Sequence, residues 1–485
     1  MTTTTDQDLT LAVDKRELLF INGAWVEPRS RHPMVPVMNA GDGEVLASVV
    51  QADTEDVDVA VHAAQAATDQ WSRSSVEERA ALLDRLADEL EVRSGVIART
   101  AALEVGTPLR TSTVLQVGLP VSVLRGFSQS VKDVAFSEAI GHSVVNRHAI
   151  GVVGAITPWN YPLHQIVAKV GAAIAAGCGI VLKPSNIAPM SAFYLAEAAI
   201  AAGMPNGLLN VLPGAGRTVG EAIAGHRGIE AVSFTGSTSA GARVAAVAAA
   251  NITKVSLELG GKSASIIAED ADLSTAVRSS VRHGLMNSGQ TCTAWTRLVV
   301  PRSKLGEVEE LVTTEIARMP VGHPLADGTR LGPLASAEQK ASVEAYVRAG
   351  KADGLRLLAT GTVDDGGHPG GYYVAPVVFT DVDPAARLAQ EEIFGPVLTI
   401  IPHDGLDHAV AIANDSEFGL AGAIWSQDED KALTYAQQMR TGQVDVNGAR
   451  FNALAPFGGF RRSGIGRELG RHGIEEFLEI SAVQR

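Results

Sequence analysis

The sequence holds one cysteine in a setting that favours reactivity. Cys292 ends the polar, glycine-containing segment Asn287-Ser-Gly-Gln-Thr-Cys292, whereas the other cysteine, Cys178, lies in an Ala/Gly run typical of a small core residue. A free thiol has a pKa of ~8.5 and is only a few per cent thiolate at neutral pH, so it needs help from its site. Cys292 is therefore the candidate nucleophile, although a cysteine in a polar loop is by itself a common feature.

A candidate general base is Glu258. It follows the apolar stretch Val255-Ser-Leu257 and precedes Gly260, Gly261 and Lys262. A carboxylate buried at the end of a strand has a raised pKa, which suits a general base working near neutral pH. The alternative is an acid that pairs with Lys262 at the edge of a sheet.

A candidate hydrogen-bond donor is Asn160, in the segment Thr157-Pro-Trp-Asn-Tyr-Pro162. Two prolines fix this loop, and the side-chain amide of Asn160 can stabilise an oxyanion, a role whose loss typically costs ~10²–10³ in rate. The alternative is an asparagine that caps a turn, which is the commoner role for this residue type.

Two segments are candidates for binding a phosphorylated cofactor. Ser233-Phe-Thr-Gly-Ser-Thr-Ser-Ala-Gly241 lies between a predicted strand and an Ala-rich helix, where glycine permits close approach and the helix N-terminus offers free N–H groups. It is not the G-x-G-x-x-G fingerprint, so a plain strand-to-helix turn remains an alternative. Lys183-Pro-Ser-Asn186 places a cation after another strand, where a solvated lysine is the alternative.

The elements that must position these residues are short buried strands alternating with Ala-rich helices from about residue 148 onward. This alternation predicts a parallel α/β sheet that binds ligands at the carboxyl ends of its strands. The expected strands are Ile150–Ile156, Gly179–Leu182, Leu208–Leu212, Ala231–Phe234 and Val255–Leu257. The expected helices are Lys169–Ala176, Met190–Ala202, Thr218–Ala224 and Ala240–Ala250.

The regions on either side have their own patterns. Residues 54–100 are predicted to be helical, with a capping box formed by Ser75 and Glu78. A second α/β lobe is expected from Leu273 to about Asn447, followed by a Gly/Arg-rich, loop-like segment, Gly458–Arg471, and a short apolar tail.

Composition excludes several classes of protein. The 485 residues carry 40 Lys and Arg against 54 Asp and Glu, a formal charge of 40 − 54 = −14, which argues against a nucleic-acid partner. Two cysteines cannot staple a chain of this length, so a reducing compartment is the default.

No targeting or membrane segment is predicted. The start, MTTTTDQDLTLAVDKRELLF, lacks the basic and apolar regions of a secretory signal. The longest apolar run, Val170–Leu182, is shorter than the ~20 residues that span a bilayer, and it fits a buried helix that leads into a buried strand. We predict a cytoplasmic protein with no membrane partner.

Taken in order along the chain, these segments resemble the aldehyde dehydrogenase superfamily. The resemblance covers essentially the whole chain after the first dozen residues. The matching motifs are Phe20-Ile-Asn-Gly23, Thr157-Pro-Trp-Asn160, Lys183-Pro-Ser185, Phe234-Thr-Gly-Ser237, Glu258-Leu-Gly-Gly-Lys262, Gly289-Gln-Thr-Cys292, Glu391-Glu-Ile-Phe-Gly-Pro396, Pro456-Phe-Gly-Gly459 and Ser463-Gly-Ile-Gly-Arg-Glu-Leu-Gly470.

The resemblance implies a role for each candidate catalytic residue. Cys292 would attack an aldehyde carbonyl to give a thiohemiacetal, whose oxyanion Asn160 and the Cys292 backbone N–H would hold. Hydride would pass to a nicotinamide, and Glu258 would activate the water that hydrolyses the thioester to the acid. Lys169 and Glu468 match family positions linked to proton relay. No metal is expected.

The resemblance also assigns cofactor and substrate contacts. The cofactor positions are Ile156, Trp159, Lys183, Ser185, Asn186, Gly214, Phe234, Gly236, Ser237, Leu259, Glu392 and Phe394. Glu392 matches the ligand of the nicotinamide ribose, and Phe394 the residue packed near the nicotinamide. The positions that line the substrate tunnel are Met286, Phe451 and Phe457.

Several residues depart from the family pattern. Asn186 replaces the Glu that accepts the adenosine ribose hydroxyls in many NAD-using relatives, so NAD is expected and NADP use is compatible with the sequence. Ala168 replaces a bulky aromatic residue, and His164 and Gln165 make the same wall more polar. We expect a wider pocket that admits long, functionalised or aromatic aldehydes.

The implied architecture is α/β and has three parts. A Rossmann-like cofactor-binding domain would comprise residues 1–127 and 150–257, an α/β catalytic domain residues 258–465, and a small β oligomerisation arm residues 128–149 and 466–485. The arm, with its apolar tail Phe477–Val483, predicts a homodimer or homotetramer. Three other functions stay open: coenzyme-A acylation, which Glu258 disfavours, a non-catalytic binding protein, and a cysteine esterase.

Overall fold

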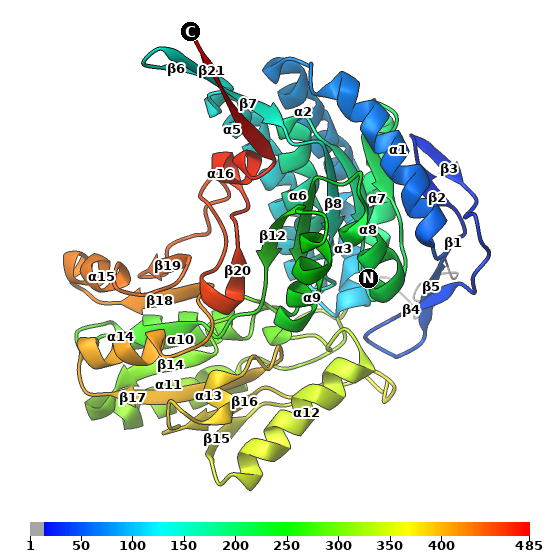
Figure 1. Cartoon of the computed structure of the whole chain (residues 1–485). Helices are drawn as coiled ribbons and strands as arrows, with labels where there is room; N and C mark the ends of the chain where they lie inside the picture. Colours follow the sequence, from blue (N-terminus) through cyan, green and yellow to red (C-terminus); the bar gives the residue numbers. More distant parts are fainter. Residues whose placement is uncertain (1–13) are drawn as a thin grey trace.

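The computed structural model describes residues 14–485 and gives an α/β architecture with two lobes and a projecting arm (Figure 1). The beginning of the predicted cofactor domain and most of the segment tested for a secretory signal, residues 1–13, lie outside the described residues. Within residues 14–485, no helix is long and apolar enough to cross a membrane.

The first lobe is built on an eight-stranded sheet, counted over the described residues. Its strands run in the order β20 (Gly464–Ile465), β12 (Lys254–Glu258), β11 (Ala231–Thr235), β8 (Val152–Ile156), β9 (Gly179–Lys183), β10 (Leu209–Val211), β2 (Leu19–Ile21) and β3 (Ala24–Val26). The five strands from β12 to β10 are parallel, as the alternating pattern predicted. Their central residues are fully buried because helices cover both faces.

The register of this sheet brings four predicted site residues to the ends of neighbouring strands: Ile156, Lys183, Phe234 and Glu258. Ile156 pairs with Lys183 on one side and with Phe234 on the other, and Thr235 pairs with Glu258. A hydrophobic core holds the strands in this register. Because parallel strands end at the same edge of the sheet, their last residues face a common crevice.

The helices of this lobe include those predicted within residues 54–100, at Met190–Ala202 and at Ala240–Ala250. The helix predicted at Lys169–Ala176 begins earlier, at Pro162, and the helices between residues 109 and 133 were not predicted. The helices are α1 (Thr54–Trp71), α2 (Val76–Val92), α3 (Ser94–Val105), α4 (Leu109–Ser112), η2 (Thr113–Gly118), α5 (Leu119–Ser130), η3 (Val131–Asp133), α6 (Pro162–Ala176), α7 (Met190–Ala201), η4 (Gly216–Gly220), α8 (Glu221–Gly225) and α9 (Thr238–Ala249). The Ser75–Glu78 capping box at the start of α2 is confirmed in both directions. The apolar run Val170–Leu182 is α6 leading into β9, also as predicted.

Two expectations need correction. The helix expected at Thr218–Ala224 is a π-helical turn, η4, followed by the short α8, since glycines at 216, 220 and 225 weaken a continuous helix. The segment Gly458–Arg471 is not only a loop: it contains η7 (Arg461–Ser463) and β20, which adds an antiparallel edge to β12. A two-residue strand has no periodic signal that the sequence could reveal.

The second lobe contains a seven-stranded sheet, again counted over the described residues. The order is β15 (Arg356–Thr360), β16 (Val377–Thr380), β17 (Val397–His403), β14 (Arg297–Pro301), β13 (Ala264–Ile267), β18 (Ala421–Trp425) and β19 (Gln443–Val446). All pairs are parallel except β15 with β16. Its helices are α10 (Leu273–Gly284), η5 (Met286–Gly289), η6 (Arg302–Lys304), α11 (Leu305–Ala317), α12 (Ala337–Ala352), α13 (Arg387–Gln390), α14 (Leu406–Asn414) and α15 (Glu429–Ala436).

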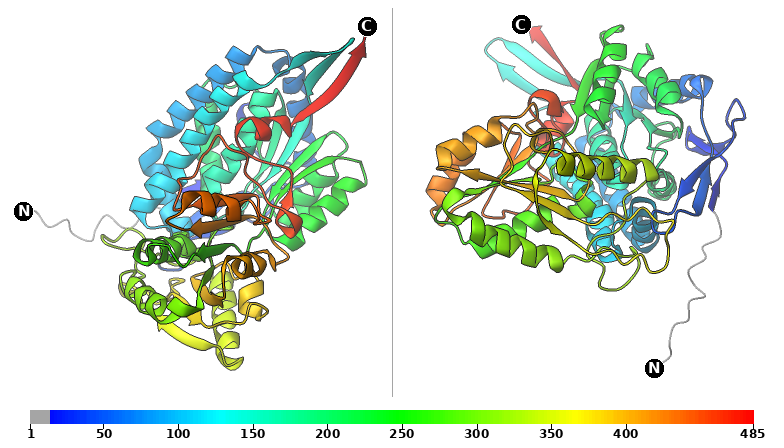
Figure 2. Two further views of the ribbon diagram at one scale, coloured as in Figure 1. Left: turned by 90° about the vertical axis from the view of Figure 1, so that its left-hand side faces the viewer. Right: turned by 90° about the horizontal axis from the view of Figure 1, so that it is seen from below.

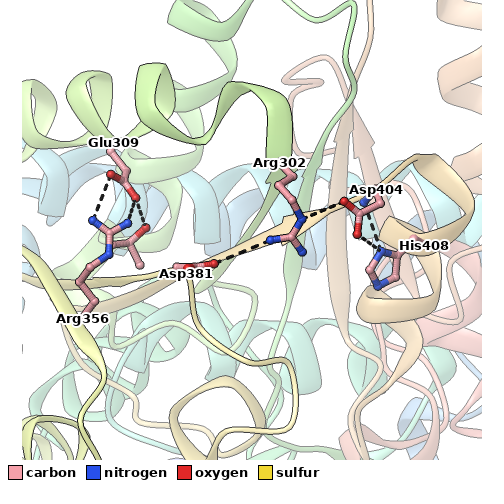
Figure 3. Close-up of polar contacts among 7 residues, drawn as sticks. Arg302, Glu309, Arg356, Asp381, Asp404 and His408 are labelled. Carbon is pink, nitrogen blue, oxygen red and sulfur yellow. Dashed lines mark hydrogen bonds and ion pairs between the residues drawn. The ribbon is translucent and has the colours of Figure 1, made fainter.

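Charged side chains tie elements together at the surface of this lobe (Figure 3). Arg302 lies 2.8 Å from Asp404 and 4.0 Å from Asp381, and Arg356 pairs with Glu309. Apart from Glu309, these side chains are largely exposed, and exposed ion pairs contribute ~0–1 kcal/mol each. None of them lines the cavities described below, so this cluster is structural.

Two smaller sheets complete the described chain. β1 (Asp14–Arg16), β5 (Val45–Val49) and β4 (Val35–Met38) form one of them. The other is the arm, in which β21 (Leu478–Gln484) pairs with β7 (Ser143–Ala149), and β7 with β6 (Ser137–Ile140). Figure 2 shows this arm projecting from the body in both views. The helix before β21, α16 (Gly470–Glu475), packs on α5 and α6 of the first lobe.

Candidate active site

The loop that carries Cys292 follows a run of three left-handed residues. Asn287, Ser288 and Gly289 have φ values of 53°, 58° and 75°. A Cβ on Gly289 would lie 2.1 Å from the carbonyl oxygen of Gly395, so only glycine fits there. The left-handed backbone of this turn would be strained by side chains larger than Asn or Ser. This conformation explains the polar, glycine-containing composition of the segment.

Two glycines bring this loop against the end of β12. A Cβ on Gly261 would lie 2.4 Å from the Cys292 carbonyl oxygen, and one on Gly260 would lie 2.1 Å from Glu392 Oε2. The chain crosses from β12 in the first lobe to β13 in the second at these residues. Gly260 and Gly261 thus allow Cys292 and Glu392, both from the second lobe, to approach the carboxyl edge of the first sheet.

Asn160 is held on several sides. Its side chain is buried, its amide Nδ2 donates to the Gln290 carbonyl at 3.1 Å, and its own carbonyl accepts from Gln116 Nε2 and from Asn287 Nδ2 at 3.0 Å each. A side-chain amide has two N–H donors. One bond fixes the orientation of Asn160 and the second hydrogen remains for another acceptor.

Glu258 is 3% exposed, and neither of its carboxylate oxygens has a hydrogen-bond partner among the described residues. It does not pair with Lys262, which was the alternative left open by the sequence. Burial raises the pKa of Glu258 well above its usual range, and the nearby Glu468 carboxylate raises it further, while Lys169 opposes this effect. A Cβ on Gly458 would lie 2.5 Å from Glu258 Oε1, so this glycine leaves room for the carboxylate.

Lys169 and Glu468 lie together behind this site. Lys169 is 1% exposed and Glu468 6%. Lys169 Nζ donates to Thr235 Oγ1 at 2.7 Å and forms an ion pair with Glu468 Oε1. The pair links α6 to the segment just before α16, and Thr235 is the register partner of Glu258.

The environment of Cys292 favours the protonated form of its thiol. Burial raises the pKa of Cys292, and the carboxylates of Glu392 and Glu258 raise it further. A reaction at this sulfur therefore requires a group that accepts its proton.

Two cavities meet at Cys292. The smaller has a volume of about 220 Å³ and is also lined by Asn160 and by six of the predicted cofactor residues, Trp159, Gly236, Ser237, Leu259, Glu392 and Phe394. The larger has a volume of about 340 Å³ and is lined by the three predicted tunnel residues, Met286, Phe451 and Phe457. The structure thus places the two predicted sets on different sides of the same thiol.

Aromatic and acidic groups shape the smaller cavity. The rings of Trp159 and Phe394 meet edge to face with centroids 5.5 Å apart. Glu392 accepts from the Gly261 N–H at 2.9 Å, and burial raises its pKa to about 7. Ser237 caps α9 by accepting from Ala240 N–H, so the helix N-terminus expected from the sequence does open at this cavity.

The other predicted cofactor residues lie outside this cavity, along the edge of the first sheet. Lys183 is 5% exposed, its Nζ donates to the Pro184 carbonyl at 2.6 Å, and burial lowers its pKa to about 8. Asn186 Nδ2 is 3.4 Å from Gln51 Oε1, and its Oδ1 has no partner among the described residues. Ser185 Oγ accepts from the Ile187 N–H at 3.1 Å.

Two further members of the predicted cofactor set are packed into the same region. A Cβ on Gly214 would lie 2.3 Å from Val219 Cγ2, so the backbone there lies close against η4. Ile156 and Phe234 are buried neighbours in the register of β8 and β11.

Sequence reasoning missed several residues that hold the site. Gln116, Asn287 and Gln290 fix Asn160, and Tyr161 hydrogen-bonds Thr291 at 2.7 Å beside Cys292. Asn287 and Gln290 stand in the motif that contains Cys292, but Gln116 is distant in sequence and has no local signal.

His164 and Gln165 line the larger cavity, whereas Ala168 is 1% exposed within the core.

The fold and this site define a class: an α/β enzyme whose cysteine stands where a cavity between two lobes meets a substrate-sized tunnel. The chain belongs to the aldehyde dehydrogenase family, whose family model matches residues 25–483.

Known proteins are similar over nearly the whole chain. The 3-succinoylsemialdehyde-pyridine dehydrogenase of a Pseudomonas species is 43% identical over 476 residues, which cover 97% of this chain and 98% of that protein. The geranial dehydrogenase of Castellaniella defragrans is 40% identical, with 96% and 98% covered. A crystal structure of a mutant of aldehyde dehydrogenase C from Pseudomonas syringae, in complex with NAD+ and octanal, has a TM-score of 0.95 at 42% identity, and 98% of each chain is covered. A Mycobacterium tuberculosis aldehyde dehydrogenase complexed with NAD+ also has a TM-score of 0.95, at 39% identity, with 98% and 99% covered.

Proposed function

We propose that this protein oxidises an aldehyde to the carboxylic acid with NAD or NADP, using Cys292 as the nucleophile. The observation that carries the proposal is the meeting of two cavities at the Cys292 thiol, with the Asn160 amide beside it. One cavity suits a flat ring and the other an aldehyde chain, so both reactants can reach the same sulfur atom.

The residues of the smaller cavity fit a nicotinamide and its ribose. Trp159 and Phe394 provide aromatic walls, and the half-buried Glu392 has a carboxylate oxygen free to accept from ribose hydroxyls. The unpartnered Oδ1 of Asn186 and the Lys183 ammonium would meet the adenosine half. When bound, the cofactor supplies the hydride acceptor. Two relatives are complexed with NAD+, and a neutral Asn186 does not repel a 2′-phosphate.

The catalytic residues act in sequence. Glu258, whose carboxylate has no partner, takes the proton of the Cys292 thiol as the sulfur bonds to the aldehyde carbon. The free amide hydrogen of Asn160 and the Cys292 backbone N–H hold the resulting oxyanion. After oxidation to the thioester, and once Glu258 has released the proton that it took from the thiol, its carboxylate takes a proton from the water that releases the acid.

The proton on Glu258 must then leave the site. We propose that Lys169, Thr235 and Glu468 carry it away from Glu258, because they connect the buried carboxylate region to the segment around residue 468. A buried, mutually hydrogen-bonded set of groups of this kind allows proton movement without exposing the thioester to bulk water.

The substrate pocket favours an aldehyde larger than acetaldehyde. A cavity of about 340 Å³, bounded by Met286, Phe451 and Phe457, leaves apolar surface uncovered by a two-carbon substrate. We expect kcat/KM to rise with chain length at ~0.8 kcal/mol per buried CH₂, or several-fold for each carbon.

The test is a panel of acetaldehyde, hexanal and benzaldehyde, each with NAD and with NADP, followed by the absorbance of the reduced cofactor. We expect reduction with hexanal and benzaldehyde in preference to acetaldehyde, and no reduction in a Cys292→Ala variant that keeps its fold and cofactor binding. Lack of reduction across the panel would count against the proposed function, and full activity of the alanine variant would sink the mechanism. Coenzyme A is then added to the same assay. We expect no change in rate, which distinguishes hydrolysis of the thioester from transfer of its acyl group to coenzyme A.

We further propose that the protein is cytoplasmic and assembles into a homodimer or homotetramer through the arm. The proposed division assigns residues 1–127 and 150–257 to the cofactor domain, 258–465 to the catalytic domain, and 128–149 with 466–485 to the arm. Supporting the assembly, Ile140 and Ile480 of the arm are 57% and 66% exposed.

A further inference from the structure

The lining of the larger cavity is mixed. Leu115 and Leu119 contribute apolar surface, and His164 and Gln165 contribute polar side chains from α6. A further polar group comes from two other elements, with Ser279 and His283 from α10 and Gln443 and Asp445 from β19. We call these four residues the polar wall.

The alternation of β19 directs two of these side chains to the cavity. Gln443 and Asp445 lie on one face of the strand, and Val444 and Val446 on the other, where they pack against a hydrophobic core. Gln443 Nε2 donates to Asp445 Oδ1 at 2.9 Å, which fixes the carboxylate and leaves Oδ2 for another donor.

Helix α10 supplies the rest of the polar wall. Ser279 and His283 are four residues apart and so share a face of the helix. His283 stacks on Trp295 with ring centroids 3.8 Å apart, and its Nδ1 has no partner among the described residues. Burial lowers the pKa of His283 to about 4, so the imidazole is neutral at pH 7 and offers a donor and an acceptor.

The charged side chains that line the larger cavity are of one sign. Among the described residues that line it, there is no Lys or Arg, and Asp445 is the one residue of acidic type. Within the described chain, Asp445 has the Gln443 amide as a partner and no cation. A substrate carboxylate that reached Asp445 would therefore meet a like charge without compensation, whereas a hydroxyl there would find an acceptor.

We propose that Asp445, oriented by Gln443 and flanked by His283, selects aldehydes that carry a hydrogen-bond donor such as a hydroxyl at the end remote from the carbonyl, and excludes aldehydes that end in a carboxylate. This inference rests on the proposed function and adds the class of substrate to it. The carbonyl end stays at Cys292, and the polar wall recognises the other end.

The test compares octanal, 8-hydroxyoctanal and 8-oxooctanoate, which share an eight-carbon chain and differ in the terminal group. In the wild-type enzyme, we expect kcat/KM for 8-hydroxyoctanal to exceed that for octanal by about tenfold, because a hydrogen bond to a charged acceptor contributes roughly that factor. For 8-oxooctanoate we expect kcat/KM to fall at least tenfold below octanal. Equal or better turnover of 8-oxooctanoate, or no gain from the hydroxyl, would overturn the inference.

Two variants of Asp445 separate charge from hydrogen bonding. Asp445→Asn removes the charge and keeps an acceptor. The ratio of kcat/KM for 8-oxooctanoate to kcat/KM for octanal should therefore rise at least tenfold. Asp445→Leu removes both, so octanal should become the better substrate than 8-hydroxyoctanal. Each readout is a ratio within one preparation, which a partial loss of active protein does not change. Unaltered ratios in both variants would contradict the proposal.

The matched control is Asp430→Asn, which removes one negative charge from an exposed position of α15 in the same lobe; its three ratios should equal those of the wild type. Turnover of all three aldehydes without preference would overturn this inference alone. Absence of turnover with any aldehyde would overturn the proposed function together with it.

Discussion

At the scale of single residues, the site depends on polar groups that burial leaves without partners. Glu258 and Asn160 are buried, and Cys292 is partly buried where two cavities meet. Burial disfavours the charged forms of an acid and of a thiol, which raises both pKa values. The protein thus keeps Cys292 uncharged until a substrate arrives, and it keeps Glu258 basic enough to accept a proton.

The substitution Glu258→Gln tests this arrangement. We expect kcat to fall by about 10²-fold or more, since general-base catalysis typically contributes ~10²–10⁴. In the wild type, kcat should rise with pH through the raised pKa of Glu258, because the carboxylate form accepts protons; the glutamine variant should lose that rise. Steady-state rates from pH 5 to 9 provide the measurement, with the exposed Glu310→Gln as control. A kcat within threefold of wild type would be incompatible with the assigned role.

A second buried acid allows a prediction on stability. Glu104 is fully buried at the end of α3, accepts from the Met190 N–H at 3.1 Å through Oε1, and has no partner for Oε2 among the described residues. Burial raises its pKa to about 8 from 4.5. Between these two values the folded protein binds one proton more than the unfolded chain at this group. The free energy of unfolding therefore falls as pH rises, by up to ~1.4 kcal/mol per pH unit.

In Glu104→Gln the contribution of this group to the pH dependence should vanish, because an amide does not titrate. We expect the difference in Tm between pH 6 and pH 8 to be smaller in the variant than in the wild type, measured by thermal unfolding at both values. The exposed Glu77→Gln on α2 is the control and should keep the wild-type difference. An identical pH dependence in Glu104→Gln would show that Glu104 is ionised in the folded protein.

At the scale of elements, the site is made where two sheets face each other. The carboxyl ends of β8, β9, β11 and β12 form one edge, and the loop that precedes β14 brings Cys292 to it from the second lobe. The β12–β13 connection passes between them, and its glycines set how closely the two lobes approach.

Gly261→Ala tests that spacing. The new methyl group would lie 2.4 Å from a backbone oxygen of Cys292, so the loop must move. We expect kcat/KM to fall at least tenfold, since a displacement of ~1 Å in a reacting group can cost ~10² in rate. The control is Gly95→Ala in α3, where an added Cβ meets nothing within 4 Å and should preserve the rate. Full activity of Gly261→Ala would show that the loop is not held at this distance.

The elements also show how far sequence patterns extend. The strands β8, β9, β11 and β12 and the helix α7 were predicted within two residues, because apolar runs between helices carry a direct signal. The π-helical turn η4 and the two-residue strand β20 were not predicted. Both are too short to show a periodic spacing of apolar residues in the sequence. The role of β20 depends on β12, which lies about 200 residues earlier in the chain and pairs with it through Leu257 and Glu258.

At the scale of the whole molecule, the arm is the feature that a single chain leaves unexplained. Ile140 and Ile480 are exposed on the same face of the three-stranded sheet, since Ile140 pairs with Ser143 and Ile480 with Arg147, two residues of the same parity on β7. Exposed apolar side chains on a projecting sheet favour contact with another chain.

The double substitution Ile140→Lys with Ile480→Lys should lower the mass in solution from that of a dimer or tetramer toward that of one chain. Size-exclusion chromatography with light scattering measures this. Glu479→Lys, whose side chain lies on the opposite face of β21, is the control and should leave the mass unchanged. A monomeric wild type, or an unaltered mass in the double variant, would refute assembly through this face.

The sequence by itself determined the identity of the chemical groups and the class of fold. Residue type and local context made Cys292, Glu258 and Asn160 candidates, and the resemblance of the ordered motifs to a family assigned their roles. The first sheet was predicted from its alternating pattern, because this signal is local. Only the tertiary structure decided which groups meet. It placed Gln116 against Asn160, left Glu258 without Lys262, set Glu392 beside Gly261 and assembled the polar wall from α10 and β19. Such contacts join residues distant in the chain, and burial, which sets their pKa values, is a property of the packed molecule rather than of any segment.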